Sequence, residues 1–194
     1  MNNQPKSNPM KTMTRYSLVA ACGIFAMFQT ACDKATPPGE SAGSTSPAAS
    51  DPRIEAVFLD TAPEGAVSIL ETRKKVEPGA VITVSGRIAG AMEPFSTDYA
   101  TLVLADDSLE TCDRVPGDSC ETPWDACCVE QKTIAASRIT VQVLGEDGRP
   151  IEQTLKQVRG MKELDGLIVT GTVAEGSSED NLILNATGIF PEGS

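Results

Sequence analysis

Apolar and polar residues alternate along five short segments of the chain, at 81–88, 99–105, 138–144, 167–173 and 181–189. A period of two puts successive side chains on opposite faces of an extended chain. Alternation over these lengths is typical of half-buried antiparallel β-strands. The residues expected to face inward are Ile82, Val84, Ile88, Ala100, Leu102, Leu104, Ile139, Val141, Val143, Leu167, Val169, Val173, Leu182, Leu184 and Ala186.

Glycines interrupt two of these segments. Gly86 lies inside the first and Gly171 inside the fourth, and a glycine within a strand indicates a bulge or a sharp bend. Five short strands, bent in the first and fourth and with a connector after the third, match a mostly β fold: a small antiparallel five-stranded OB-like barrel preceded by a short helix. Alternation alone is also compatible with a β-sandwich of similar strand count.

Elements of other kinds are expected around the strands. Residues 54–59 have the composition of a short strand or edge segment. A helix is expected to begin after Thr61, a possible N-cap, and to end before Pro78 and Gly79. The connector 151–164 is expected to hold a short helix with Leu155 and Val158 facing inward.

The N-terminal region has the pattern of an export signal. A basic stretch at 11–15 precedes 13 largely apolar residues at 16–28, which is signal-peptide length and too short to span a membrane. The next residues, Gln-Thr-Ala-Cys32, resemble the lipobox of bacterial lipoproteins, whose cysteine becomes the lipidated first residue. Residues 19–22 end in Cys22 and fit the lipobox wording better, but they would leave too short an apolar region. We therefore expect a lipoprotein signal peptide at 1–31 and lipidation at Cys32.

The segment after the expected signal has too few large hydrophobic residues to fold. Sixteen of the 20 residues 33–52 are Ala, Ser, Gly, Thr or Pro, and none is a large hydrophobe. Such a segment cannot bury enough apolar surface to form a core, and a flexible coil of this length spans about 25 Å. We expect residues 32–52 to be the lipidated cysteine and a disordered tether, and 53–194 to be the barrel domain. The chain would then face the periplasm or the cell exterior, attached to a membrane through Cys32.

The composition of the chain argues against several classes of function. The formal net charge is −11, so a nucleic-acid partner is not expected. The chain contains no histidine, which removes the commonest general base and excludes Ser-His-Asp and Cys-His catalysis within the chain. Acids such as Asp98, Asp106 and Asp107 would be the candidates in an enzyme, but nothing in their spacing indicates a catalytic pair. We expect no catalytic residues, no cofactor and no enzyme activity.

Four of the six cysteines lie in one stretch between the second and third strands. They are Cys112, Cys120, Cys127 and Cys128, and the stretch also holds Trp124, the single tryptophan. An insertion of this length needs something to hold it, and exported chains meet an oxidising compartment, so two disulfides are the first expectation. A zinc site with four thiolates is the alternative, although paired C-x2-C spacing is missing. Redox chemistry is less favoured because there is no Cys-x-x-Cys.

The disulfide pairing is open between two arrangements. Neighbouring side chains of an extended chain point to opposite faces, so a Cys127–Cys128 bond would be strained. The remaining pairings are Cys112–Cys128 with Cys120–Cys127, or the crossed arrangement. The first would close the base of the insertion, with Trp124 covering a disulfide or forming a contact surface. The many acids of this stretch could also bind calcium, but the EF-hand spacing is missing.

Two resemblances extend this interpretation. Residues 82–88 (ITVSGRI) are similar to the first strand of a small bacterial OB-like family, over roughly residues 62–190. The motif at 116–128 (PGDSCETPWDACC), with the closing Asn185-Ala-Thr-Gly-Ile189, resembles an uncharacterised group of planctomycete-type exported lipoproteins with a G-D-x-C-x-T-P-W-D-x-C-C motif. This resemblance implies an envelope location and an OB-like domain. We expect a non-catalytic binding or structural module whose partner is another envelope protein or a glycan, or alternatively a metal-binding module using the four cysteines.

Overall fold

The computed structural model describes residues 50–74, 77–178 and 180–193. The expected signal segment, Cys32 and almost all of the expected tether therefore lie outside the described residues. Among the described residues, no helix has the length and apolar character needed to cross a membrane. The helices and strands are α1 (Pro52–Glu55), β1 (Val67–Ser68), α2 (Ile69–Arg73), β2 (Val81–Ile88), β3 (Thr101–Ala105), the 3-10 helix η1 (Cys112–Arg114), α3 (Gln131–Ala136), β4 (Arg138–Gln142), the 3-10 helix η2 (Val158–Gly160), β5 (Gly166–Val173) and β6 (Ile183–Glu192).

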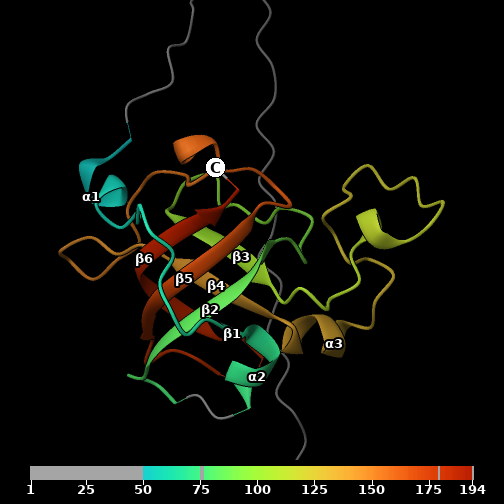
Figure 1. Ribbon diagram of the computed structural model, residues 1–194, viewed down its shortest axis with the longest axis horizontal. Coiled ribbons are helices and arrows are strands. Elements are labelled where there is room, and N and C mark those ends of the chain that lie inside the picture. Colours follow the sequence, from blue (N-terminus) through green and yellow to red (C-terminus); the bar gives the residue numbers. More distant parts are fainter. Residues whose placement is uncertain (1–49, 75–76, 179, 194) are drawn as a thin grey trace, which may run out of the picture. The chain divides into compact units, whose positions relative to one another are not determined.

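Five strands form a closed barrel (Figure 1). The strand order is β2-β3-β4-β6-β5, and β5 pairs again with β2 to close the ring. β4 and β6 are parallel, whereas the other four pairings in the ring are antiparallel. The OB-like fold is thus confirmed, and ring closure excludes a two-sheet sandwich. The two-residue β1 adds a parallel pairing on β2.

The inward faces of the strands fill the barrel, as the alternation predicts. Val84, Leu104, Val169 and Leu184 are fully buried, and α1 and the connector after β4 add Ile54 and Leu155 to the same core. Burying a large aliphatic side chain contributes about 1.5–3 kcal/mol. Each strand therefore contributes to a shared apolar interior that holds the barrel closed.

The two strand glycines lie where strands approach most closely. A Cβ on Gly86 would stand 2.5 Å from the carbonyl oxygen of Ala105 on β3, and one on Gly171 would overlap the backbone of Asn185 on β6. The register of β5 against β6 shifts between Thr170 and Gly171, which marks a bulge. The bends expected at these positions are consistent with the close backbone contacts that close the barrel.

The elements before the barrel differ from the expectation. Residues 54–59 are not a strand: α1 occupies Pro52–Glu55 because Asp51 accepts a hydrogen bond from the Arg53 amide, as an N-cap does, and Phe58 makes a single bridge to Ile189. The helix predicted from Thr61 begins instead at Ile69, where Ser68 Oγ accepts from the Glu71 amide at 3.2 Å. A capping serine close to the packed residues determines where this helix starts.

Two further differences concern connectors. In the segment 151–164 the helix is reduced to η2, and both Gln157 and Arg159 have positive φ, which interrupts a regular helix. Leu155 and Val158 nevertheless face inward as expected. The helix α3 was not predicted; its six residues include one fully packed apolar side chain, Ile134, so the helical period was too short to detect.

Candidate metal centre

The cysteine insertion, residues 106–137, leaves the barrel after β3 and returns at β4. Its ends are joined where the Asp106 amide donates to the Ser137 carbonyl at 2.7 Å. The buried Asp106 carboxylate accepts from the Leu70 amide at 3.0 Å and from both the amide and the hydroxyl of Ser108. Burial alone would raise the pKa of Asp106, but these hydrogen bonds outweigh it and hold the pKa below its ordinary value. The neck of the insertion is therefore fixed to α2.

The two limbs of the insertion lie alongside each other. The Cys112 amide donates to the Asp125 carbonyl, and the Asp113 amide donates to the Pro123 carbonyl, both at 2.8 Å. The limb carrying Trp124 also reaches the barrel, because the Gly90 amide donates to the Trp124 carbonyl at 2.8 Å. These backbone bonds bring segments separated by some ten residues into register and place their cysteines together.

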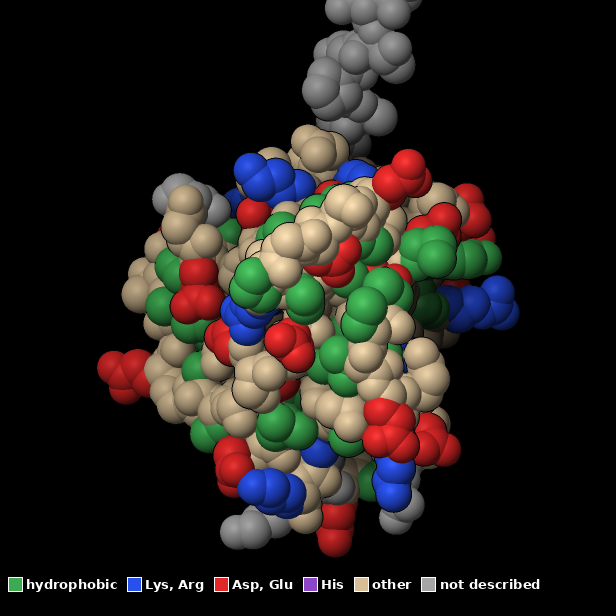
Figure 2. Space-filling model, turned by 90° about the vertical axis from the view of Figure 1, so that its right-hand side faces the viewer, with side chains coloured by type: hydrophobic (Ala, Val, Ile, Leu, Met, Phe, Trp, Pro, Cys, Tyr) green, Lys and Arg blue, Asp and Glu red, His purple; other side chains and the backbone are tan. Residues whose placement is uncertain are grey.

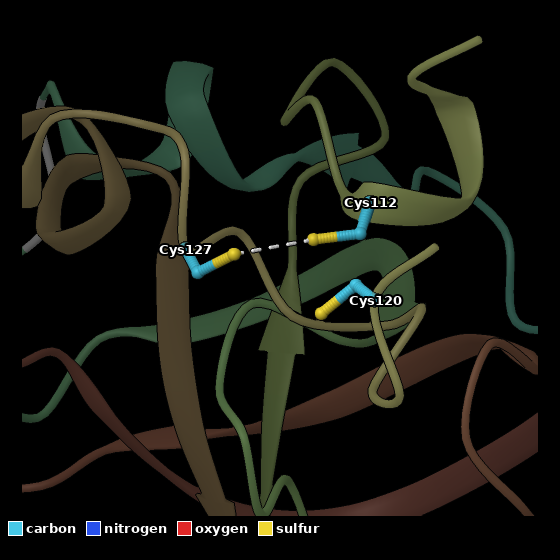
Figure 3. A group of neighbouring side chains, drawn as sticks. All are labelled: Cys112, Cys120 and Cys127. Atoms are coloured by element: carbon cyan, nitrogen blue, oxygen red, sulfur yellow. Dashed lines mark hydrogen bonds between the residues drawn. The ribbon is translucent and has the colours of Figure 1, made fainter. Parts of the chain in front are cut away.

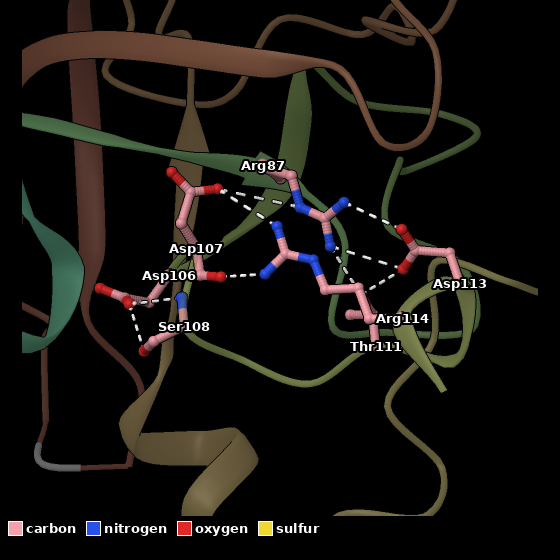
Figure 4. Close-up of polar contacts among 7 residues, drawn as sticks. All are labelled: Arg87, Asp106, Asp107, Ser108, Thr111, Asp113 and Arg114. Atoms are coloured by element: carbon pink, nitrogen blue, oxygen red, sulfur yellow. Dashed lines mark hydrogen bonds and ion pairs between the residues drawn. The ribbon is translucent and has the colours of Figure 1, made fainter. Parts of the chain in front are cut away.

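Arg87 attaches the insertion to the barrel. It lies on the outward face of β2, yet its side chain is only 15% exposed because the insertion covers it. Its guanidinium donates to Thr111 Oγ1 at 2.6 Å and to Asp113 Oδ2 at 3.1 Å, and it lies 3.8 Å from Asp107 (Figure 4). Burial would raise the pKa of Asp113, but hydrogen bonds from Arg87 and Thr111 and the nearby positive charges lower it overall.

Three cysteine sulfurs converge inside the insertion. The Sγ atoms of Cys112, Cys120 and Cys127 all lie within 4.8 Å of one another, with Cys112 and Cys127 3.5 Å apart (Figure 3). Cys112 comes from η1 and is buried, whereas Cys127 is exposed. Cys128 is not part of this group, although its Sγ lies 3.9 Å from that of Cys127. Three of the four sequence-predicted cysteines are thus brought together, with the fourth at their edge.

All four of these cysteines are free thiols in the structure. A sulfur–sulfur bond is about 2.05 Å long, so none of the expected disulfides is formed. The sulfur of Cys112 lies next to that of Cys127 rather than that of Cys128. This proximity matches the crossed arrangement, in which Cys112 would bond Cys127 and Cys120 would bond Cys128. The expectation that Cys127 and Cys128 point apart is also wrong. They lie in a turn closed by the Val129 amide donating to the Ala126 carbonyl, so extended-chain alternation does not apply.

These sulfur spacings suit a thiolate-bound metal ion. Four thiolates at 2.3 Å from a tetrahedral zinc are separated from one another by about 3.8 Å. The observed separations of 3.5 Å for Cys112–Cys127 and 3.9 Å for Cys127–Cys128 lie on either side of that value. Cys112, Cys120 and Cys127 can therefore act as three ligands with small adjustments, whereas the Cys128 side chain would have to move to become the fourth.

The thiols differ in how readily they ionise. Burial, together with hydrogen bonds involving Cys127 and Cys120, raises the pKa of Cys112 to about 12. The pKa of Cys120 is lowered, chiefly by hydrogen bonding with the Thr122 hydroxyl at 3.4 Å. For Cys127, the hydrogen bond with Cys112 lowers the pKa, but Cys128 and burial raise it overall. A divalent cation would replace these protons, since thiolates rather than thiols are the metal ligands.

The acidic residues do not form a comparable site. Within the described residues, the cysteine group is the one set of three or more possible ligands that converges. Asp107 and Asp113 are paired with Arg87, and Asp106 is bonded to Ser108 and α2. Asp98, in a separate turn, accepts from the Thr97 hydroxyl. The structure thus does not bring the three candidate catalytic acids together, and the calcium alternative gains no support.

Trp124 packs on a small apolar cluster between the insertion and the barrel. It is half-buried, and the cluster comprises Ala89, Ala105, Leu109, Ala126 and Ile134. Its Nε1 donates to the Met92 carbonyl at 2.9 Å. Together with Met92 and Pro94 it lines a groove of about 360 Å³. The tryptophan therefore attaches the insertion to the loop before β3 and also presents part of its ring to a surface groove.

Sequence reasoning missed the role of Arg87. Alternation placed it correctly on the outward face of β2, but the insertion that covers this face was not foreseen. The nearest signal was Asp113 in the insertion, because a partly buried carboxylate needs a cation or hydrogen bonds.

Comparison with known proteins returned no family model, no curated protein and no solved structure that matches the chain. The class of the molecule is accordingly defined by what the structure contains: an OB-like barrel carrying an inserted thiol cluster. The likeness to planctomycete-type lipoproteins stays a prediction.

Proposed function

We propose that this protein is a non-catalytic binding module of the bacterial cell envelope, held at a membrane by lipid on Cys32, and that its cysteine insertion binds a thiophilic metal ion such as Zn²⁺. The observation that carries the metal assignment is the convergence of three unbonded thiols, Cys112, Cys120 and Cys127, within 4.8 Å. Cys128 is the proposed fourth ligand.

The chemistry of the ligands supports a soft or borderline cation. Thiolates favour zinc or Cu⁺ over magnesium and calcium, which prefer oxygen ligands. A site closed by four protein thiolates leaves no open position for substrate, which is the pattern of a structural zinc rather than a catalytic one. In this proposal the ion stabilises the insertion and fixes its surface.

The partner would then contact a surface shaped by the bound ion. Trp124 belongs to the cysteine insertion and shares a groove with Met92, and a partly exposed tryptophan is a frequent anchor in protein interfaces. On the face shown in Figure 2, hydrophobic side chains are interspersed with acidic and basic ones. We propose another envelope protein as the partner here, with nucleic acid disfavoured by the net charge of −11.

A disulfide-stapled insertion is the second candidate, favoured by a specific distance. The Sγ atoms of Cys112 and Cys127 are 3.5 Å apart, so a small side-chain rotation could bring them to bonding distance. Cys120 and Cys128 would form the other bond. This candidate agrees with the proposed export to an oxidising compartment.

Intact mass and metal analysis separate the two candidates. Protein purified from the native envelope without reductant or chelator is expected to carry about one zinc per chain and four reactive thiols in the insertion once the metal is removed. Cys112→Ser is expected to abolish stoichiometric zinc. Glu110→Gln, an exposed acid of the same insertion, is the matched control and should retain it. A mass gain of about 4 Da on reduction, with no bound metal, would instead establish two disulfides.

The location is tested independently at Cys32. The unaltered full chain is expected to incorporate radiolabelled palmitate and to sediment with membranes. Cys32→Ser should lose the label and be released from the membrane fraction, whereas Cys22→Ser should keep it. Labelling that persists in Cys32→Ser but disappears in Cys22→Ser would show that the lipidated residue is the alternative one.

A further inference from the structure

A second cleft is lined by residues of α1 and of the turn 145–152, and by none of the cysteines. In Figure 1, α1 lies on the other side of the barrel from α3. The volume of the cleft is about 870 Å³, within the range of small-molecule binding sites. It is bounded by Arg53, by the segment leading into β3 with Tyr99 and Thr101, and by the turn 145–152 with Asp147 and Arg149. The proposed metal function makes no use of this cleft.

The floor of the cleft is held by backbone hydrogen bonds. The Ala100 amide donates to the Ile151 carbonyl at 2.8 Å, and the Ile151 amide donates to the Val143 carbonyl at 3.0 Å. Ala100 and Ile151 are buried. The Thr154 hydroxyl fixes the far end by donating to the Ser96 carbonyl at 2.6 Å. A site fixed in this way needs little ordering when a ligand binds.

A hydrogen-bond donor and an acceptor meet above Gly145. Asp51 holds two nitrogens of Arg53, Nε at 3.0 Å and Nη2 at 2.6 Å. The third nitrogen, Nη1, lies 3.1 Å from the point where a Cβ of residue 145 would stand, and Asp147 Oδ1 lies 3.1 Å from the same point. Both atoms therefore border the backbone of Gly145, and Asp147 Oδ1 also accepts from the Arg149 amide at 3.1 Å. A ligand hydroxyl group, which both donates and accepts, suits a donor and an acceptor that border the same stretch of backbone.

An aromatic ring stands in the same cleft. Tyr99 is 46% exposed in a chain whose aromatic residues make up 4% of the sequence. The faces of sugar rings carry C–H groups that pack on aromatic rings, while the ring edges carry hydroxyls. The cleft thus offers a flat apolar surface next to polar groups able to bind hydroxyls.

The charges in the cleft narrow the ligand class. Two arginines face three carboxylates, those of Glu146, Asp147 and Glu152, so an anionic ligand would meet net repulsion in an already acidic protein. A fully apolar ligand would leave the polar groups without hydrogen bonds. An uncharged polyhydroxylated ligand satisfies donors and acceptors of both kinds.

We infer that this cleft binds an uncharged oligosaccharide, with Tyr99 packing on a sugar ring and with Arg53 and Asp147 binding its hydroxyls. A glycan would then be a second kind of partner, bound at a site separate from the proposed metal-stabilised surface around Trp124. It does not rest on metal binding, so it can be tested on protein with or without zinc.

The mature chain, purified in a non-glycosidic detergent, is titrated calorimetrically with maltotriose, cellotriose, xylotriose and chitotriose. Saturable binding of at least one probe is expected, and Tyr99→Ala should weaken it by about tenfold. Gly145→Val, which places a side chain between Arg53 and Asp147, should weaken it at least as much. Val81→Ala, a change at an exposed side chain of β2 outside the cleft, is the control and should bind as the unaltered chain does.

Circular dichroism verifies that each variant is folded. The inference is overturned if none of the four probes saturates at 10 mM, a concentration of about ten times a weak Kd of 1 mM. It is equally overturned if a probe binds and folded Tyr99→Ala and Gly145→Val retain full affinity, since the sugar would then occupy another surface.

Discussion

The barrel and the cysteine insertion are built on different principles. In the barrel, every strand pairs on both sides and apolar side chains fill a shared interior. The insertion has a small apolar cluster made largely of alanines, and it is attached through Arg87, the Asp106 neck and a few backbone bonds. The barrel can therefore be stable by itself, whereas the insertion depends on polar contacts and on whatever joins its thiols.

The largest expected effect is a core truncation. Leu184→Ala removes a fully buried side chain of β6 and should lower the free energy of unfolding by about 2–5 kcal/mol. Urea denaturation followed by circular dichroism measures this loss. Val81→Ala, at a residue of β2 that is 72% exposed, is the control and should change stability by less than about 0.5 kcal/mol. Equal losses in both variants would contradict the assigned core.

An intermediate effect is expected where the two regions meet. Arg87→Met removes the cation bonded to Thr111 and Asp113 and should cost about 1–3 kcal/mol. Hydrogen exchange should show lost protection in the insertion while the β5–β6 ladder stays protected. Arg149→Met, at a side chain that is 84% exposed, should leave both regions unchanged. Loss of protection across the whole barrel would show that the insertion is not a separate unit.

Metal affinity should depend strongly on pH. The pKa of Cys112 is raised to about 12, so this thiol is protonated in the metal-free protein throughout the neutral range and must lose its proton on binding. We expect the apparent zinc affinity to rise by about tenfold or more per pH unit between about pH 6 and 9. Competition with a chromophoric chelator measures it. A pH-independent affinity would exclude Cys112 as a ligand.

The smallest expected effect is a local loss of stability in the insertion at low pH. The pKa of Asp113 is lowered in the folded protein, so its stabilising contribution is present above the ordinary value of about 3.9 and is lost as pH falls below it. Protection factors of amides near residue 113 should therefore decrease below about pH 4. Asp113→Asn should lose this dependence, and Glu110→Gln should keep it. An unchanged profile in Asp113→Asn would assign the acid sensitivity to another group.

Much of the barrel could be predicted from the sequence, and the insertion much less. The alternation identified all five barrel strands because half-buried strands need a period of two, and Val84 and Leu104 are buried as expected. The short helices were misplaced because α2 and α3 span only five and six residues, too few for a helical period to emerge. Their positions follow from Ser68 capping and from the packing of Ile134.

For the cysteines, the sequence determined that four thiols fall in one stretch that must be held together, and it predicted a tether and a lipid site at Cys32. The tertiary structure decided which sulfurs are neighbours. Cys112 lies beside Cys127 because backbone bonds align the two limbs, and Cys127 and Cys128 share a side because they lie in a turn. Contacts of this kind depend on distances between separate segments, which linear spacing does not contain. The approach of Arg53 and Asp147 to the backbone of Gly145 was decided in the same way.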